Sequence, residues 1–231
     1  MEKKIGILGG MGPLASAFFY NMITEHTKAE KDQDHIQLIL LSDPSVPDRT
    51  KVIESGSFEE LDAKLLANCR ILENAGCDAV CATCNTAHFF MNHIEDQLNV
   101  PLLHMINLTA ESLKDLKGER IGIMATDGTI KTKLYQSALE KYGLEPYTPS
   151  EDTQNKVMYE IYGRIKAGER YNEKLWGEIE ADYRQAGCKH VILACTELSV
   201  IKQEEKLGDY FVDAMEVLAK KVIEFAGKEY K

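Results

Sequence analysis

The sequence predicts an α/β protein of two Rossmann-like lobes, each with a parallel sheet, related by pseudo-twofold symmetry. Three observations predict this class. Short apolar strands alternate with amphipathic helices along most of the 231 residues, a pattern typical of parallel β-α-β units. A glycine-rich turn follows the first strand. The second half of the chain repeats patterns of the first half at a nearly constant spacing, which indicates an internal duplication.

The elements of the first half follow from apolar periodicity and from turn residues. The expected elements are a strand at 3–8, a helix from 14 to about 29, a strand at 36–41, a helix at 58–75, a strand at 79–82 and a helix at 86–98. Pro13 suits the first position of the first helix. A polar loop, residues 42–50, follows the second strand.

The second half repeats this plan. The expected elements are a strand at 119–124, helices at 129–142, 151–167 and 172–186, a strand at 190–194 and a closing helix at 213–226. No linker stands out by composition, and Gly118 is the expected boundary between the halves.

Counting residues supports the duplication. Residues 4–8 align with residues 120–124 at an offset of 116 (120 − 4). At a second offset of 111 (188 − 77), the aligned pairs are Gly76 with Gly187, Cys77 with Cys188, Val80 with Val191, and Cys84 with Cys195. Two matches with nearly equal offsets indicate one repeated unit.

Composition and charge disfavour several classes of protein. The chain has 27 basic and 37 acidic side chains and a formal net charge of −10, so nucleic acid is not an expected partner. With 44% hydrophobic and 28% charged residues, the chain is expected to fold into a globular protein. We expect no membrane span, because no run approaches the roughly 18 apolar residues that one needs. No signal peptide is recognised either, so we expect a cytoplasmic protein with free thiols.

Two cysteines at equivalent places in the two halves are the candidate catalytic residues. Cys84 and Cys195 each follow a predicted strand, and ligands of parallel sheets bind at the carboxyl ends of the strands. If the lobes face each other, the two thiols approach one ligand from opposite sides. Inversion of a stereocentre needs a base on one face and an acid on the other. A thiol with a reference pKa of about 8.5 can be either, and a following helix N-terminus is expected to lower that pKa.

Polar groups near the two cysteines supply the expected binding and supporting side chains. Those expected to hold the α-carboxylate and amine of an amino acid are Asn85, Thr86 and Thr196. Those expected to orient or tune the thiols are His88 and Glu197. The turn after the first strand of each half adds expected substrate contacts at Met11 and Thr126.

Two other motifs suggest different functions. Residues 81–84 have the C-x-x-C spacing of redox and zinc sites, but no second Cys or His pair follows at metal spacing, so we expect no metal. Residues 10–15 fit the G-x-G-x-x-A pattern of dinucleotide binding. However, the first acid after the second strand, Asp43, lies in a polar loop rather than at the strand end where a ribose-binding acid is expected. A dinucleotide- or ligand-binding module stays as an alternative.

Three ordered motifs carry a resemblance to the aspartate/glutamate racemase superfamily, and to its aspartate racemase branch in particular: residues 9–13 (GGMGP), 84–88 (CNTAH) and 194–198 (ACTEL). The resemblance spans almost the whole chain. It implies amino-acid racemisation without pyridoxal phosphate or any other cofactor, and it implies a homodimer. It also implies that the C-terminal helix returns to the first lobe. The expected lobes are then residues 1–117 with 208–231, and residues 118–207.

The same resemblance assigns a cationic pair to the side-chain carboxylate of aspartate. The matching positions are Arg49 and Lys166, whose separation of 117 (166 − 49) is close to the repeat offset. The expected substrate is therefore a small dicarboxylic amino acid, and Arg can grip its carboxylate bidentately. A glutamate or broad-specificity racemase stays as an alternative, and so does another reaction of the superfamily, such as decarboxylation or cis–trans isomerisation.

Overall fold

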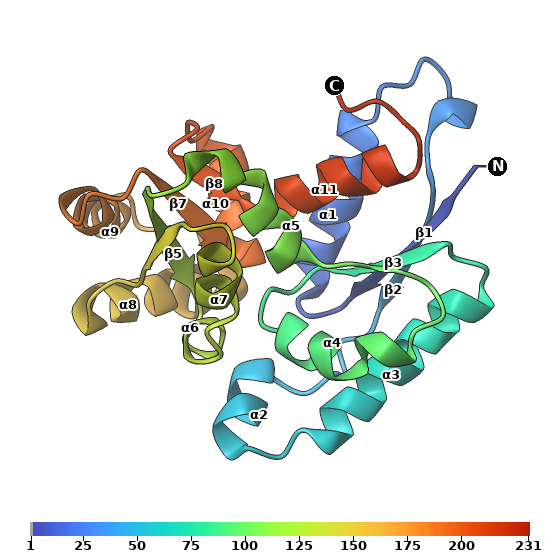
Figure 1. Cartoon of the computed structure of the whole chain (residues 1–231), viewed down its shortest axis with the longest axis horizontal. Helices are drawn as coiled ribbons and strands as arrows, with labels where there is room; N and C mark the ends of the chain where they lie inside the picture. The colour runs from blue at the N-terminus through green and yellow to red at the C-terminus, as the bar shows by residue number, and fades with distance from the viewer. Residues whose placement is uncertain (1) are drawn as a thin grey trace. The chain divides into compact units, whose positions relative to one another are not determined.

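The computed structural model of the protein describes residues 2–231, which form two compact units (Figure 1). Unit 1 runs up to Leu108 and resumes from Met215 to Lys231, and unit 2 is Thr109–Ala214. Each unit contains one four-stranded sheet whose paired strands are all parallel. The predicted α/β class with two parallel sheets is therefore confirmed.

The sheet of unit 1 has the strand order β2-β1-β3-β4. Its strands are β1 (Lys4–Gly9), β2 (Gln37–Ser42), β3 (Ala79–Ala82) and β4 (Leu102–Leu103). Its helices are α1 (Pro13–His26), α2 (Arg49–Ser55), α3 (Glu59–Asn74), α4 (His88–Ile94), the first half of α5 (Met105–Ser112) and nearly all of α11 (Ala214–Phe225). Pro13 begins α1 as expected, because its fixed φ suits the first helical position.

Helices cover both faces of this sheet, with α1 on one face and α3 and α4 on the other (Figure 1). Leu61 and Leu65 of α3 and Phe90 of α4 are almost fully buried and belong to one apolar cluster with Leu8 and Val80 of the sheet. Strands covered on both faces are expected to be nearly all apolar, as β1 and β3 are. The C-terminal segment returns to the end of α1, where the ring of Tyr230 stacks on His26 at 5.1 Å.

The sheet of unit 2 has the order β6-β5-β7-β8. Its strands are β5 (Arg120–Ala125), β6 (Glu145–Tyr147), β7 (His190–Ala194) and β8 (Phe211–Asp213). Its helices are α6 (Asp127–Lys131), α7 (Leu134–Glu140), α8 (Glu151–Met158), α9 (Glu173–Gln185) and α10 (Thr196–Glu205). Ile179 and Tyr183 of α9 and Leu198 of α10 are fully buried in one cluster with Val191 and Leu193 of β7.

The two sheets have the same register as well as the same strand order. In unit 1, β1 pairs with β3 at Ile5–Ala79, Gly6–Val80, Ile7–Cys81 and Leu8–Ala82. In unit 2, β5 pairs with β7 at Ile121–His190, Gly122–Val191, Ile123–Ile192 and Met124–Leu193. Adding 116 to the first member and 111 to the second converts each pair of unit 1 into a pair of unit 2. The structure thus supports the duplication predicted by counting.

Several elements differ from those expected. The single helix expected at 129–142 is two helices, α6 and α7, because Lys133 between them has a φ of 55°, which a right-handed helix does not allow. The helix expected at 151–167 changes after Met158 into a π-helical turn, Tyr159–Arg164, and then a 3₁₀ turn, Ile165–Ala167. The short strands β4, β6 and β8 were not expected, because two or three residues show no periodicity.

Candidate active site

A buried hydroxyl group holds the glycine-rich turn after β1. The Ser16 Oγ of α1 accepts the Gly10 backbone N–H at 3.0 Å and donates to the Gly12 carbonyl at 2.8 Å. It also lies 2.8 Å from the hydroxyl of Thr83, the residue before Cys84. Both hydroxyl side chains are fully buried. This pair connects the turn to the segment that carries the candidate thiol. The sequence predicted no role for either residue, because the only signal of each is a hydroxyl within an apolar pattern.

The turn approaches the segment after β2 very closely. Gly10 has a φ of 90°, and a Cβ at this position would lie 2.4 Å from backbone atoms of Asp43. The Asp43 backbone N–H donates to the Gly9 carbonyl at 3.3 Å. Only glycine combines this φ with this approach, so the requirement for Gly10 is structural.

The Arg49 guanidinium lies beside the turn. Arg49 is the first residue of α2, whose N-cap, Asp48, accepts the Lys51 N–H, so the polar loop expected at 42–50 ends in a helix. The guanidinium donates to the Met11 carbonyl at 3.3 Å and to the Pro47 carbonyl at 2.9 Å. The structure therefore brings together Met11 and Arg49, two of the residues expected to bind substrate.

Cys84 lies in unit 1, two residues after the end of β3, and its exposure is 8%. The buried His88 ring is held between its Nδ1, 2.9 Å from the Cys84 carbonyl, and its Nε2, which accepts the Met105 N–H at 3.1 Å. Because Nε2 accepts, Nδ1 carries the proton and donates to Cys84. Burial lowers the pKa of His88 to about 4, so the ring is neutral at pH 7.

Asn85 and Thr86 form the turn between Cys84 and α4. Both side chains are almost fully buried, and their carbonyls accept the backbone N–H groups of His88 and Phe89. Cys84 thus precedes the helix by a turn and is not its N-cap, which is Ala87. The helix expected at 86–98 therefore begins two residues later than expected, at His88.

Cys195 lies in unit 2 directly after β7, where it is the N-cap of α10, and its exposure is 7%. Its thiol donates to the Glu197 Oε2 at 2.9 Å. The other carboxylate oxygen of Glu197 accepts the Lys166 ammonium at 2.6 Å. The Thr196 hydroxyl is 3.4 Å from Glu197 Oε2. Four of the predicted residues therefore form one cluster, and its centre is the Glu197 carboxylate.

Burial and charge set the protonation of Cys195. Burial raises the pKa of its thiol well above the usual range, and the negative charge of Glu197 raises it further, while the Lys166 ammonium lowers it. The expectation that the helix N-terminus would lower this pKa is therefore wrong for Cys195, because desolvation outweighs the hydrogen bond from the Glu197 backbone N–H. Cys195 is a thiol at neutral pH.

Thr126 follows β5 as Cys195 follows β7, and Ala125 pairs with Ala194 across the two strands. The Thr126 hydroxyl caps α6 by accepting the Thr129 N–H at 3.3 Å. Thr126 thus lies in the turn after the first strand of the second half, as expected, and it has a structural role as the N-cap of α6.

The geometry disfavours the interpretation of the glycine turn as a dinucleotide-binding motif. Asp43, the acid that would bind a ribose, accepts the Ser45 hydroxyl at 2.6 Å and the Asn68 amide at 2.9 Å, and it pairs with Lys64 at 3.1 Å. These donors hold its pKa well below the usual range. Its carboxylate therefore serves to order the loop.

Two absences among residues 2–231 bear on other functions. No three Asp, Glu, His or Cys side chains in this range gather closely enough to hold a metal ion. No helix in it is long and apolar enough to cross a membrane. All six cysteines, including Cys81 of the C-x-x-C spacing, are free and buried.

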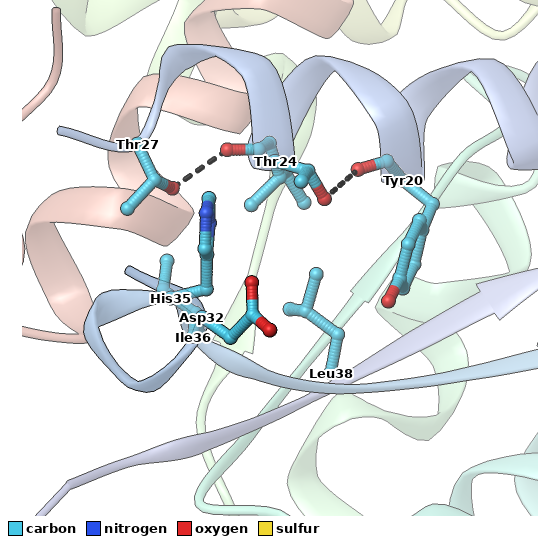
Figure 2. Close-up of a pocket in the computed structure, with 8 residues that line it drawn as sticks. Tyr20, Thr24, Thr27, Asp32, His35, Ile36 and Leu38 are labelled. Atoms are coloured by element: carbon cyan, nitrogen blue, oxygen red, sulfur yellow. Dashed lines mark hydrogen bonds between the residues drawn. The ribbon is translucent and has the colours of Figure 1, made fainter. Parts of the chain in front are cut away.

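A cavity of about 220 Å³ lies between the second half of α1 and the start of β2. Figure 2 shows Tyr20, Asp32 and His35 around it. Because α1 runs back from the carboxyl edge of the parallel sheet, this cavity lies near the amino end of β2, away from the turn that holds Gly10. It is therefore separate from the candidate site.

Comparisons with known proteins agree with this arrangement. The sequence model of the Asp/Glu/Hydantoin racemase family matches residues 8–222. The structure is similar to that of the Picrophilus torridus aspartate racemase, with a TM-score of 0.84 and 30% identity over 99% of this chain and 96% of that one. The chain is 25% identical to a broad-specificity amino-acid racemase of Bacillus subtilis over 95% and 96% of the two chains. It is 29% identical to a glutamate racemase of Aquifex pyrophilus over 64% and 58%.

Proposed function

The chain belongs to the Asp/Glu/Hydantoin racemase family, and on that basis we propose that it interconverts L- and D-aspartate without a cofactor. The thiols of Cys84 and Cys195 are the two catalytic groups. The observation that carries the proposal is the equivalence of the two cysteines. The offset of 111 that converts β3 into β7 in the two registers also relates Cys84 to Cys195. Two similar groups at matching strand ends suit a reaction that needs one acid and one base.

The proposed reaction transfers one proton in each direction. One cysteine, as thiolate, removes the α-proton, so that the C–H bond breaks and an S–H bond forms. The other cysteine, as thiol, protonates the opposite face, so that its S–H bond breaks and a C–H bond forms. The reverse reaction exchanges the two roles. Cys195 begins as the thiol, because burial and Glu197 raise its pKa, and it therefore starts as the acid.

Substrate binding is assigned to the polar groups at the two strand ends. Arg49 and Lys166 hold the side-chain carboxylate, and the α-carboxylate and amine bind Asn85, Thr86 and Thr196. The contacts of Arg49 with the Met11 and Pro47 carbonyls support this role, because they orient the planar guanidinium for a bidentate bond. Met11 and Thr126 complete the proposed contacts.

His88 and Glu197 are positioning residues in this proposal. His88 fixes the Cys84 carbonyl to the start of α5 through its two ring nitrogens. Glu197 orients the Cys195 thiol through a hydrogen bond at 2.9 Å. We also propose the homodimer that the family resemblance implies, which light scattering on the purified protein can test.

A second candidate is a racemase of glutamate or of broader range. The similarity to the broad-specificity and glutamate racemases favours it. Two cations select a dicarboxylate but do not by themselves set its length. Rates on aspartate, glutamate and alanine, measured with one enzyme preparation, separate these candidates.

The direct test follows the circular dichroism of L-aspartate with the purified protein and no added cofactor. Cys84→Ala and Cys195→Ala are each expected to lower the rate by about 10²- to 10⁴-fold, the contribution of a general acid or base. Cys77→Ala and Cys188→Ala are the matched controls, because both residues are buried and are related by the same offset of 111. They should retain activity.

A two-base reaction also has an isotopic signature. In D₂O, each variant with one catalytic cysteine should exchange the α-proton of one enantiomer only, the one whose α-proton faces the remaining thiol. This exchange should not invert the stereocentre. Proton NMR of each enantiomer measures this exchange. Full racemisation by either single variant contradicts the proposal.

A further inference from the structure

The lysine assigned to substrate binding is already held by a carboxylate of the protein. The Lys166 Nζ lies 2.6 Å from Glu197 Oε1, and the exposed fractions of the two side chains are 26% and 8%. The second oxygen of Glu197 accepts the Cys195 thiol, so this carboxylate is fixed in place. Glu197 therefore presents to Lys166 the same chemical group that the side chain of aspartate would present.

We propose that Glu197 is an internal competitor for Lys166, which a substrate's side-chain carboxylate must displace. An amino acid without a side-chain carboxylate leaves the pair intact. The inference rests on the proposed function, because that function assigns Lys166 to the side-chain carboxylate. It makes Glu197 a specificity-determining residue in addition to its role beside the thiol.

The chemistry of lysine suits such an exchange. An ammonium group is a compact charge on a flexible four-carbon stem, so it can pass from one carboxylate to another without matching a planar geometry. Lys166 lies on the short 3₁₀ turn that follows the π-helical turn, and its Nζ is 5.4 Å from the ring centre of Tyr162. The Lys166 side chain is the more exposed member of the pair, so the ammonium group is accessible to an incoming carboxylate.

If Glu197 competes with the ligand for Lys166, removal of the Glu197 charge should tighten the binding of a dicarboxylate. The probe is succinate, a dicarboxylate that has no amine and cannot be racemised. Isothermal titration calorimetry compares the wild type with Glu197→Gln, which keeps the side-chain shape and removes the charge. We expect succinate to bind the variant at least about tenfold more tightly, equivalent to about 1.4 kcal/mol. Lys166→Met should lose most of the succinate affinity.

A matched control separates competition from a general change of charge. Glu205→Gln also removes a carboxylate from α10, one that pairs with Arg170 at 2.8 Å, and it should leave succinate affinity unchanged. Propionate, which has one carboxylate, should bind the wild type and Glu197→Gln equally. Glu197→Asp keeps the charge but shortens the side chain. It should tighten succinate binding by a smaller factor, which provides a test if Glu197→Gln does not fold.

The outcomes distinguish this inference from the proposed reaction. Unchanged or weaker succinate binding by Glu197→Gln overturns the competition, and so does equal tightening by Glu205→Gln. If the wild type racemises aspartate while succinate affinity does not respond to Glu197, the racemase stands and the competition fails. If succinate affinity responds as expected but no amino acid is racemised, the competition stands and the proposed reaction fails.

Discussion

Replacement of Gly10 by alanine is expected to damage the protein far more than the same replacement at Gly56. Both glycines have a positive φ, 90° at Gly10 and 72° at Gly56. A Cβ at Gly10 would lie 2.4 Å from the Asp43 backbone, whereas a Cβ at Gly56 would meet no atom within 4 Å. Gly56→Ala therefore measures the cost of the left-handed conformation alone.

The structure gives the expected magnitudes. The left-handed conformation costs a residue with a Cβ about 1–2 kcal/mol, which is the expected loss of unfolding free energy for Gly56→Ala. At Gly10, ordinary contact begins near 3.4 Å, so the Asp43 backbone must move by about 1 Å. Overpacking adds about 1–3 kcal/mol, and the expected total is about 2–5 kcal/mol. Gly10 adjoins Met11, whose carbonyl holds Arg49. A turn that rearranges to relieve the clash therefore displaces this carbonyl, and a misplacement of 1 Å can cost about 10²-fold in rate.

Urea unfolding followed by circular dichroism measures the first effect, and racemisation of aspartate measures the second. Gly56→Ala should retain nearly full activity, since its glycine lies at the end of α2 and meets no neighbour. If Gly10→Ala is as stable and as active as Gly56→Ala, the argument from close approach is wrong.

Three further predictions concern buried polar groups. Burial holds the pKa of His88 at about 4, below its ordinary 6.5, so the unfolded chain takes up the extra proton at a higher pH than the folded protein does. The unfolding free energy of the wild type therefore falls by up to about 3 kcal/mol as the pH falls from 6.5 to 4. His88→Asn should show a smaller loss over this range in urea unfolding, and equal losses contradict the assignment. Glu197→Gln should lower the pKa of Cys195, since the Glu197 charge raises it. Mass spectrometry should then detect alkylation of Cys195 by iodoacetamide at lower pH, and an unchanged pH profile refutes this. Ser16→Ala should cost about 1–3 kcal/mol in urea unfolding, because it removes the acceptor of the buried Gly10 N–H, and a neutral result would mean that this bond adds no stability.

Much of the fold could be predicted because the central strands are short apolar runs with turn residues at their ends. The expected strand at 190–194 coincides with β7, and that at 79–82 with β3. Helix interruptions were harder to predict. Lys133 is a good helix former by intrinsic preference, yet its backbone is left-handed, with a φ of 55°. A local pattern carries no signal of such a break.

Candidate site residues divide in a similar way. Their positions at the strand ends followed from chain order, and Cys195 does lie directly after β7. The contacts of these residues could not be predicted from chain order. Asp43 was considered only as a ribose ligand, whereas its backbone meets Gly10 and its carboxylate binds Asn68, 25 residues away. Ser16 and Thr83, 67 residues apart, gave no pattern that joined them.

The sequence by itself determined the alternation of the longer strands with helices, the duplication of the chain, and the equivalence of positions 84 and 195. These properties depend on local periodicity and on counts along the chain, which a sequence contains directly. Only the tertiary structure decided that Lys166 meets Glu197, 31 residues away, and that Glu197 also accepts the hydrogen bond of the Cys195 thiol. Such contacts arise when helices and turns pack over a sheet, because packing sets which charged groups share a buried space, and no local pattern of residues encodes that choice.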